Sequence, residues 1–201
     1  MLSYNEIINP TDERVRKILQ AGERHFERLG VRKASIDEIC ADADISKPTF
    51  YKYFDSKQAL FFAVRIYTAR NLYTIYGERS KELKTAAQKL VCFFKLIEEF
   101  SLSNKLFAST FDANPELRRD WIKHPLSIES YLHRVDFVEK ITLEGIASDE
   151  FRSADPRALA HVVITSTFLI PTLRQAAPEF LPKDTSISEF VFDLLLNGIK
   201  K

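Results

Sequence analysis

The 201-residue sequence predicts an all-α protein, and three observations support that fold class. Apolar residues recur at i, i+3, i+4 and i+7 along most of the chain, which is the spacing of one helix face. Apolar and polar residues do not alternate over a run long enough for a half-buried strand. Glycine is rare, with 5 residues, and the sequence has no glycine-rich phosphate-binding loop. The composition, 45% hydrophobic and 28% charged, is that of a globular protein with its own core.

The first expected helix begins near Thr11, because residues 11–13 supply a capping side chain and first-turn acids. Apolar residues then fall on one face until Gly30, which has the position of a C-terminal stop. A second, short helix is expected from Ser35, since Ser35 and Glu38 have the spacing of a capping box. This helix should end within two turns.

A third short helix is expected from Ser46, which can cap it, to about Phe54. Pro48 fits the first turn, because the backbone N–H that proline lacks would have been unpaired there. Phe50 and Phe54 are four residues apart and would form the buried face of this helix.

Ser56 is the expected cap of a much longer helix, which reaches Gly77 and links two domains. Prolines and capping residues divide the sequence that follows it. Further helices are expected at about residues 80–103, 104–112, 115–123, 126–147, 156–177 and 186–199.

Two short helices joined by a tight turn, the second one capped by serine, have the arrangement of a helix-turn-helix motif. A recognition helix enters the major groove with its N-terminus first, so its leading residues must reach bases and phosphates. Lys57, in the first turn of the next helix, would meet the DNA backbone beside the groove. The side chains of the third helix that project away from its apolar face are Lys47, Thr49, Tyr51, Lys52 and Tyr53.

Residues 15–60 resemble the N-terminal domain of the TetR family of bacterial transcriptional regulators. The resemblance rests on SIDEIC at residues 35–40 and on ISKPTFYKYFDSKQAL at residues 45–60, which keeps the family's Tyr-x-Tyr-Phe-x-Ser-Lys pattern. Two positions depart from that pattern. Asp44 stands in the turn where the family usually has glycine, and aspartate tolerates left-handed backbone better than most residues. Asp37 stands where family members often carry a neutral or basic residue.

The resemblance implies a ligand-responsive regulator, most readily a repressor, that binds a palindromic operator as a homodimer. A small-molecule effector would release the DNA. It implies a helix-turn-helix DNA-binding domain over residues 1–56 and an effector-binding and dimerisation domain over residues 57–201, with about nine helices in all. The side chains assigned to DNA binding are Ser35, Ser46, Lys47, Thr49, Tyr51, Lys52, Tyr53 and Lys57.

The second domain is dense in aromatic residues, most of which must form its core. A cavity between helices, lined by such side chains and a few polar groups, is also how an all-helical domain holds an apolar effector. The sequence leaves both roles open for each aromatic residue. The candidates for effector binding are Phe94, Phe107, Trp121, Tyr131 and Phe168.

Dimerisation requires a large apolar face that is complementary to itself. The last two expected helices offer such a face, and spacing alone does not divide its residues between core and interface. The stripe consists of Leu159, Val162, Val163, Ser166, Phe168 and Ile170, followed by Phe190, Val191, Leu194 and Leu195.

Glu129, His133 and Asp136 lie at i, i+4 and i+7 and would share one helix face. They are the only support for an alternative in which the chain is an all-helical enzyme or a metal-binding protein. No nucleophile motif, metal signature or cofactor loop accompanies them, so an ion pair is the favoured interpretation. We therefore expect no enzyme, no catalytic residue, no metal and no cofactor. A DNA-binding activator or architectural protein without an effector is the other alternative.

Cys40 and Cys92 lie in apolar runs and have no CxxC partner, so neither a disulfide framework nor a zinc site is expected. The first residues lack the basic and apolar regions of a signal peptide, and no apolar run has the length of a membrane span. The sequence predicts a cytoplasmic protein with no membrane partner. The formal net charge of +1 means that any DNA-binding surface must arise from the local placement of charge.

Overall fold

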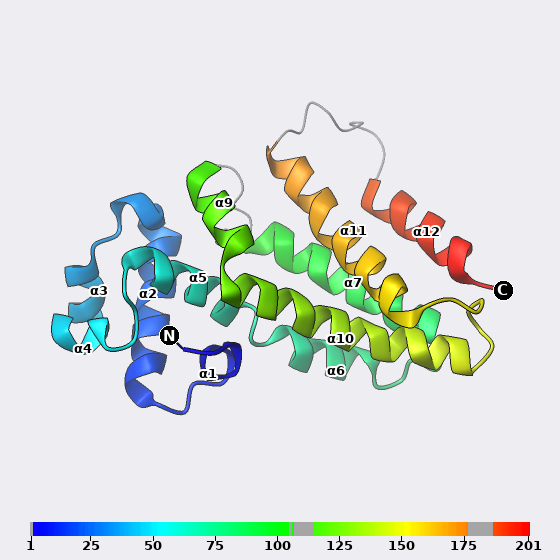
Figure 1. Ribbon diagram of the computed structural model, residues 1–201, viewed down its shortest axis with the longest axis horizontal. Coiled ribbons are helices and arrows are strands. Elements are labelled where there is room, and N and C mark those ends of the chain that lie inside the picture. Colours follow the sequence, from blue (N-terminus) through cyan, green and yellow to red (C-terminus); the bar gives the residue numbers. More distant parts are fainter. Residues whose placement is uncertain (1, 105, 107–114, 177–186) are drawn as a thin grey trace. The chain divides into compact units, whose positions relative to one another are not determined.

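The computed structural model describes residues 2–104, 106, 115–176 and 187–201 (Figure 1), and only the backbone of residues 115, 168–176 and 187–189. Helices are the only extended regular structure in this part of the chain. A single isolated β-bridge in it pairs Phe151 with Lys200. The predicted all-α fold class is confirmed. Of the described helices, none has both the length and the apolar character that a membrane span needs.

The chain divides into two compact units. Of the described residues, the first unit contains 2–71, 106 and 115–130, and the second contains 72–104, 131–176 and 187–201. The first unit therefore extends past residue 56 and includes the helix that follows the helix-turn-helix segment. The functional division at residue 56 stays a prediction.

The first unit begins with α1 (Tyr4–Ile8), a short helix that the sequence analysis did not predict. Ser3 caps it through a capping box with Glu6, which satisfies backbone N–H groups at the helix start. Ile7, in its last turn, is completely buried. Burial of one such side chain, and not intrinsic helix propensity, is what holds so short a helix in place.

The second helix, α2 (Glu13–Lys33), starts where the sequence predicted. The Asp12 side chain is its cap and accepts a hydrogen bond of 2.8 Å from the backbone N–H of Arg14. Gly30 interrupts the helix with a φ of +72°, and one further turn follows before Ala34. The expected stop at Gly30 is therefore a kink, because glycine enters left-handed backbone without the strain that a Cβ would cause.

Three helices follow α2 in the first unit and lead into its core. They are α3 (Ile36–Asp42), α4 (Lys47–Tyr51) and α5 (Lys57–Thr68). Ser56 caps α5 by accepting a hydrogen bond of 3.0 Å from the backbone N–H of Ala59, as the sequence predicted.

The prediction of one long helix from Ser56 to Gly77 is wrong. The chain leaves helical geometry after Thr68 and a separate helix, α6 (Leu72–Ser80), follows. At the end of α5 the backbone N–H groups of Ala69 and Arg70 bond three residues back, to the carbonyl oxygens of Ile66 and Tyr67 (both 3.1 Å). The Arg70 guanidinium donates a further hydrogen bond of 2.9 Å to the Tyr67 carbonyl oxygen and lies 3.9 Å from the centre of the Tyr67 ring.

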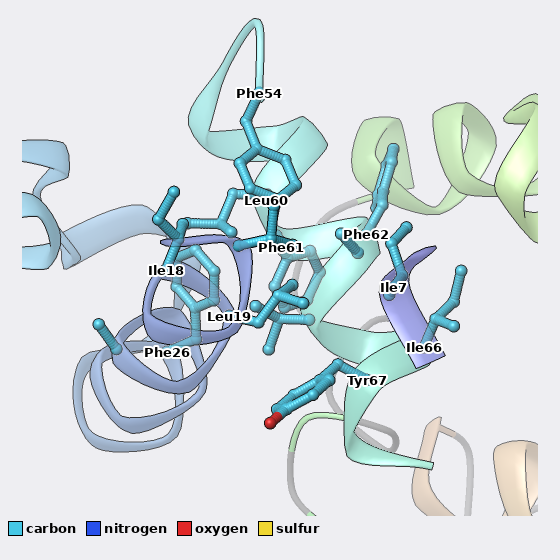
Figure 2. Close-up of a cluster of buried hydrophobic side chains, with 14 of the residues drawn as sticks. Ile7, Ile18, Leu19, Phe26, Phe54, Leu60, Phe61, Phe62, Ile66 and Tyr67 are labelled. Atoms are coloured by element: carbon cyan, nitrogen blue, oxygen red, sulfur yellow. The ribbon is translucent and has the colours of Figure 1, made fainter. Parts of the chain in front are cut away.

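The core of the first unit surrounds α5, in which every residue from Leu60 to Thr68 is buried. Figure 2 shows the apolar side chains of α2 and α5 packed together, with Phe26 and Phe61 edge to face at a centroid distance of 5.4 Å. The two helices approach closely at Gly22, where a Cβ would lie 2.9 Å from a methyl carbon of Val64. The glycine therefore sets the separation between α2 and α5.

The last helix wholly in the first unit is α9 (Pro115–Lys123). It lies within the expected range 115–123. Trp121 on α9 packs against Phe62 of α5, with ring centroids 5.2 Å apart. The guanidinium carbon of Arg65 lies 4.9 Å from the Trp121 ring centre, so a buried cation is held against an aromatic face.

The second unit is built from α6, α7 (Ala86–Ser103), most of α10 (Pro125–Ala147), α11 (Pro156–Ala176) and α12 (Ile187–Ile199). Helices α10, α11 and α12 lie close to the expected ranges, whereas α7 begins at residue 86 and not at 80. The helix expected at 104–112 falls almost wholly outside the described residues. The buried residues of this core include Leu90, Phe93, Phe94, Ile97, Val135, Val138, Ile164, Phe192 and Leu196.

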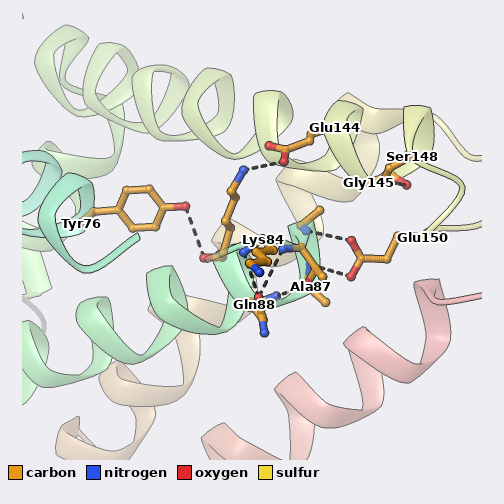
Figure 3. Close-up of polar contacts among 11 residues, drawn as sticks. Tyr76, Lys84, Ala87, Gln88, Glu144, Gly145, Ser148 and Glu150 are labelled. Atoms are coloured by element: carbon orange, nitrogen blue, oxygen red, sulfur yellow. Dashed lines mark hydrogen bonds and ion pairs between the residues drawn. The ribbon is translucent and has the colours of Figure 1, made fainter. Parts of the chain in front are cut away.

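The turn after α10 is tied to the start of α7. The Glu150 carboxylate accepts hydrogen bonds from the backbone N–H groups of Ala86 (2.7 Å) and Ala87 (3.1 Å), as Figure 3 shows. An anionic oxygen is favourable there because the first N–H groups of a helix lack partners within it. The next residue, Phe151, donates its backbone N–H to the Gly145 carbonyl oxygen at 2.9 Å. Its ring fills the space beside Gly145.

We expect the substitution Gly145→Ala to destabilise the protein by about 1–3 kcal/mol, because overpacking a filled core forces side chains or backbone to shift. A Cβ at residue 145 would lie 2.2 Å from a ring carbon of Phe151, and that ring is almost completely buried. Equilibrium unfolding in urea would measure the change in the free energy of unfolding.

Gly77→Ala is the matched control, since Gly77 lies in α6 and a Cβ there meets nothing within 4 Å. Alanine favours a helix over glycine by about 0.5–1 kcal/mol, so this variant should be more stable than the unchanged protein. Equal effects of the two substitutions would contradict the proposed packing at Gly145.

Candidate nucleic-acid interface

The short helix α3 starts at Ser35, as predicted. The Ser35 hydroxyl accepts a hydrogen bond of 3.2 Å from the backbone N–H of Asp37. Glu38 was expected to complete a capping box with Ser35. Its carboxylate lies instead 3.9 Å from the Nδ1 atom of buried His25. Ser35 is thus a helix cap that stays half-buried at the surface.

The turn between α3 and α4 depends on Asp44, whose φ is +55°. The backbone N–H of Ile45 donates to the Cys40 carbonyl oxygen at 3.0 Å, and the N–H of Asp44 donates to the Ala41 carbonyl oxygen at 3.2 Å. These bonds close the end of α3 in the way a left-handed residue allows. Aspartate therefore fills the position where glycine was expected, in the conformation that glycine adopts most easily.

Helix α4 is held at its start by Ser46. The Ser46 hydroxyl accepts the backbone N–H of Thr49 at 3.3 Å and lies 2.9 Å from the Thr49 hydroxyl. The helix ends at Tyr51 rather than near Phe54, because the next two N–H groups bond three residues back, to the carbonyl oxygens of Thr49 and Phe50. Phe50 and Phe54 are both buried, which confirms the predicted inner face.

The outer face of α4 is open to solvent. Ser46, Lys47, Tyr51 and Lys52 are exposed, and Thr49 is half-buried. Half of the Tyr51 surface (50%) is accessible, although the edge of its ring rests against Phe50 at a centroid distance of 5.3 Å. The hydroxyl and ammonium groups of this face project from a helix whose other side is fixed in the core.

Tyr53, a predicted DNA-facing residue, is bonded within the protein. Its hydroxyl donates a hydrogen bond of 2.6 Å to the second carboxylate oxygen of Asp12, the cap of α2. This bond, with the backbone N–H of Arg14, lowers the pKa of Asp12. The same bond raises the pKa of Tyr53. Tyr53 thereby ties the segment after α4 to the start of α2.

Lys57, the predicted backbone contact, is also engaged. Its ammonium donates to the carbonyl oxygens of Ala34 (2.7 Å) and Arg32 (3.2 Å) at the end of α2. A cation is favourable at the C-terminal end of a helix, where carbonyl groups lack helical partners. The start of α5 is therefore fixed to the end of α2.

Lys47, the first residue of α4, forms an ion pair with Asp37 on α3, with 2.5 Å between Nζ and the nearer carboxylate oxygen. The sequence analysis assigned no partner to either residue. Asp12 was likewise placed only as a cap, and not as the acceptor for Tyr53. No spacing signal reveals such pairs, because the Asp12 and Tyr53 positions are 41 residues apart.

The described members of the predicted effector set fall in both compact units. Phe94 is buried in the second unit with its ring centroid 4.4 Å from that of Phe192, whereas Trp121 packs in the first unit. The Tyr131 hydroxyl lies 2.7 Å from the Nδ1 atom of His161. Phe107 and the side chain of Phe168 lie outside the described residues. Their role in binding an effector stays a prediction.

The residues of the metal or enzyme alternative have other partners. Asp136 pairs with Arg157 at 2.9 Å, and Glu129 accepts the backbone N–H of Tyr4 at 3.2 Å. Within the part of the chain that the structure describes, no three histidine, cysteine, aspartate or glutamate residues are grouped to hold a metal ion. The described structure therefore does not group Glu129, His133 and Asp136 as ligands of a metal ion.

Both cysteines are free thiols. Cys40 is buried and Cys92 is half-buried, and burial raises the pKa of each thiol. A raised pKa leaves little of the reactive thiolate at neutral pH. Cys40 therefore behaves as a small core residue.

Comparison with known proteins identifies the segment that contains this interface. A family model described as "Bacterial regulatory proteins, tetR family" matches residues 18–64, which run from α2 into α5. The transcriptional activator FasR of Mycolicibacterium smegmatis is 31% identical over 113 residues, which cover 54% of this chain and 52% of FasR. The match thus spans about half the length of that relative. The regulator YhgD of Bacillus subtilis is 21% identical over 164 residues, covering 76% of this chain and 79% of YhgD.

Solved structures share the fold over nearly the whole chain. The transcriptional regulator FadR of Bacillus subtilis, in complex with stearoyl-CoA, has a TM-score of 0.65 and 20% identity, covering 92% of this chain and 98% of FadR. A protein of unknown function from Rhodococcus sp. RHA1 has a TM-score of 0.67 and 19% identity, covering 96% of this chain and 100% of that protein. The helix-turn-helix segment, residues 18–64, is thus similar to the N-terminal domain of the TetR family of bacterial transcriptional regulators.

Proposed function

We propose that this protein reads a palindromic DNA operator as a homodimer and represses transcription until a small-molecule effector releases it. The observation that carries this proposal is the placement of α4. Phe50 and Phe54 anchor one side of the helix in the core, while Tyr51 and Lys52 project from the other side into solvent. A short helix that is fixed on one side and polar on the other is what direct readout of the major groove requires.

The predicted DNA-binding residues divide into two groups in this proposal. The exposed residues Ser46, Lys47, Tyr51 and Lys52 and the half-buried Thr49 contact bases and phosphates, and Ser35 does so from the start of α3. Tyr53 and Lys57 contribute mainly by holding α4 and α5 to the two ends of α2, since their polar groups already bond to Asp12 and to the carbonyl oxygens of residues 32 and 34. Residues 1–56 thus form the DNA-reading domain of the proposal.

The apolar surface of α11 and α12 supports the homodimer. Val162, Phe190 and Leu194 are 46%, 61% and 61% exposed, although their helices pack together and bury Val163, Phe192 and Leu196. Large apolar side chains that face solvent on adjacent helices are typical of an interface between subunits. Domain 57–201 would hold this interface and the effector.

The effector is proposed to be apolar, because aromatic and aliphatic side chains form the interior of the second unit. The solved FadR structure contains stearoyl-CoA, so long-chain acyl-CoA is the first compound class to test. The relative FasR is named an activator, which keeps activation as the alternative to repression. A promoter fusion transcribed with and without the purified protein distinguishes the two signs.

Selection of bound duplexes from a random DNA pool should recover a palindrome, because a two-fold symmetric dimer presents two copies of α4. The variant Tyr51→Phe/Lys52→Gln should bind the selected duplex at least about tenfold more weakly, through loss of one hydroxyl and one charge. The Phe ring keeps the edge contact with Phe50, so folding should be unaffected. Fluorescence anisotropy measures the affinity.

Lys95→Gln is the control for this experiment, because Lys95 is an exposed lysine on α7 in the second unit. It should leave operator affinity within about twofold of the original. Equal losses for Lys95→Gln and the α4 variant, or recovery of no preferred sequence, would rule out readout by α4.

Leu194→Glu should convert the dimer into a monomer, since it places a charge in an apolar interface. Sedimentation velocity should then report the mass of one 23.2 kDa chain. Leu143→Glu is the control, because Leu143 is 48% exposed on α10 and lies outside the proposed interface. A Leu194→Glu protein that remains dimeric would place the interface elsewhere.

An effector that binds the folded protein should raise its melting temperature and weaken operator binding together. At a ligand concentration of 100 times Kd, the expected gain in unfolding free energy is about 2.7 kcal/mol. A coupling of about 1–3 kcal/mol would lower operator affinity roughly 5- to 150-fold. A compound that raises the melting temperature but leaves operator affinity unchanged would show binding without the proposed release.

A further inference from the structure

The Asp37–Lys47 ion pair lies on the surface that the proposed function assigns to DNA. Asp37 is in the first turn of α3, Lys47 is the first residue of α4, and their side chains are 65% and 53% exposed. Among the ion pairs of the described residues, this is the one that involves α4. The Asp37 carboxylate is thus paired with the ammonium group at the start of the proposed recognition helix.

We propose that Asp37 restrains sequence-independent DNA binding by holding the Lys47 ammonium, so that a phosphate must displace the carboxylate before it can bind. This inference rests on the proposed readout of DNA by α4. It assigns Asp37 the role of a positioning residue, which acts through Lys47 and not by contact with a base.

The physical argument concerns the source of sequence-independent affinity. Binding to an arbitrary duplex comes almost entirely from cationic side chains that replace the counterions of phosphates. An ammonium that is already paired gains less from a phosphate, because it gives up one anion to take another. The displaced carboxylate then stays near the DNA backbone, where like charges repel.

A second acidic side chain near α4 provides a control for the effect of net charge. Asp44 is an exposed aspartate in the turn between α3 and α4, and no ion pair joins it to a described residue. It lowers the net charge of this surface by the same amount as Asp37 but holds no lysine. A comparison of the two therefore separates pairing with Lys47 from the effect of net charge alone.

Asp37 also stabilises α3, because a negative charge is favourable in the first turn of a helix. The Ser35 cap bonds to the backbone N–H of residue 37, so Asp37→Asn keeps that hydrogen bond. Any loss of helix stability appears in the melting temperature, independently of DNA binding.

The test measures binding of the full-length protein to a random-sequence duplex by fluorescence anisotropy, over a salt titration from about 50 to 300 mM. Asp37→Asn should tighten binding about three- to tenfold at the lowest salt. It should also steepen the slope of log affinity against log salt by about one for each DNA-reading domain. Asp44→Asn is the control and should change affinity by no more than about twofold; asparagine suits its left-handed backbone. In a Lys47→Gln background, Asp37→Asn should also change affinity by no more than about twofold.

Three results would overturn the inference. Asp37→Asn could change the melting temperature without tightening binding to the random duplex, which would make Asp37 a helix-stabilising residue only. Asp37→Asn and Asp44→Asn could tighten binding equally, which would assign the effect to net charge. Asp37→Asn could act as strongly in the Lys47→Gln background as in the unchanged protein.

The salt titration and the duplex selection described above together separate failure of this inference from failure of the proposed function. If the unchanged protein selects a palindrome and Asp37→Asn does not tighten random-duplex binding, only the inference fails. If the folded protein binds neither selected nor random duplexes at 50 mM salt, the DNA-reading function fails and the inference fails with it.

Discussion

Burial of α5 on all sides is the constraint on which the first unit depends. Its residues from Leu60 to Thr68 have no solvent-facing side, so α2, α1 and Trp121 must each supply an apolar surface. Each large side chain removed from water contributes about 1.5–3 kcal/mol, which outweighs the low intrinsic stability of the short helices around it. The Gly22 contact then fixes α2 against α5, and α2 in turn supports α3 and α4. The position of the proposed recognition helix therefore depends on the core of the first unit, to which α4 contributes Phe50.

Polar side chains at the proposed DNA surface serve two purposes. Tyr51 and Lys52 face solvent because Phe50 and Phe54 are buried on the other side of the chain. Tyr53 and Lys57 form hydrogen bonds within the protein, and Lys47 forms an ion pair within it. An exposed ion pair contributes little to stability, about 0–1 kcal/mol, so its effect on where a charge is available matters more than its energy. The surface is therefore less positive in function than its count of lysines suggests.

Local sequence patterns predicted much of this structure. Ser35, Ser46 and Ser56 cap the expected helices, and the apolar residue at every third or fourth position identified the buried faces. The patterns failed at the end of α5, where backbone N–H groups bond three residues back, and in α1, where burial of Ile7 stabilises a helix of five residues. At the site, spacing identified which residues face outward but not which ones pair, because Asp12 meets Tyr53 only after the chain has folded back on itself.

The bonds at the two ends of α2 make folding of this region cooperative. Tyr53 holds its first turn through Asp12, and Lys57 holds its last carbonyl groups, so the segment after α4 clamps a helix of 21 residues at both ends. Opening of the segment from Tyr53 to Lys57 would release both clamps together, and its closure would restore them together. Backbone amides at opposite ends of α2 should therefore exchange their hydrogens through one shared opening event and not by independent fraying. The recognition helix and its support are in this sense a single unit of stability.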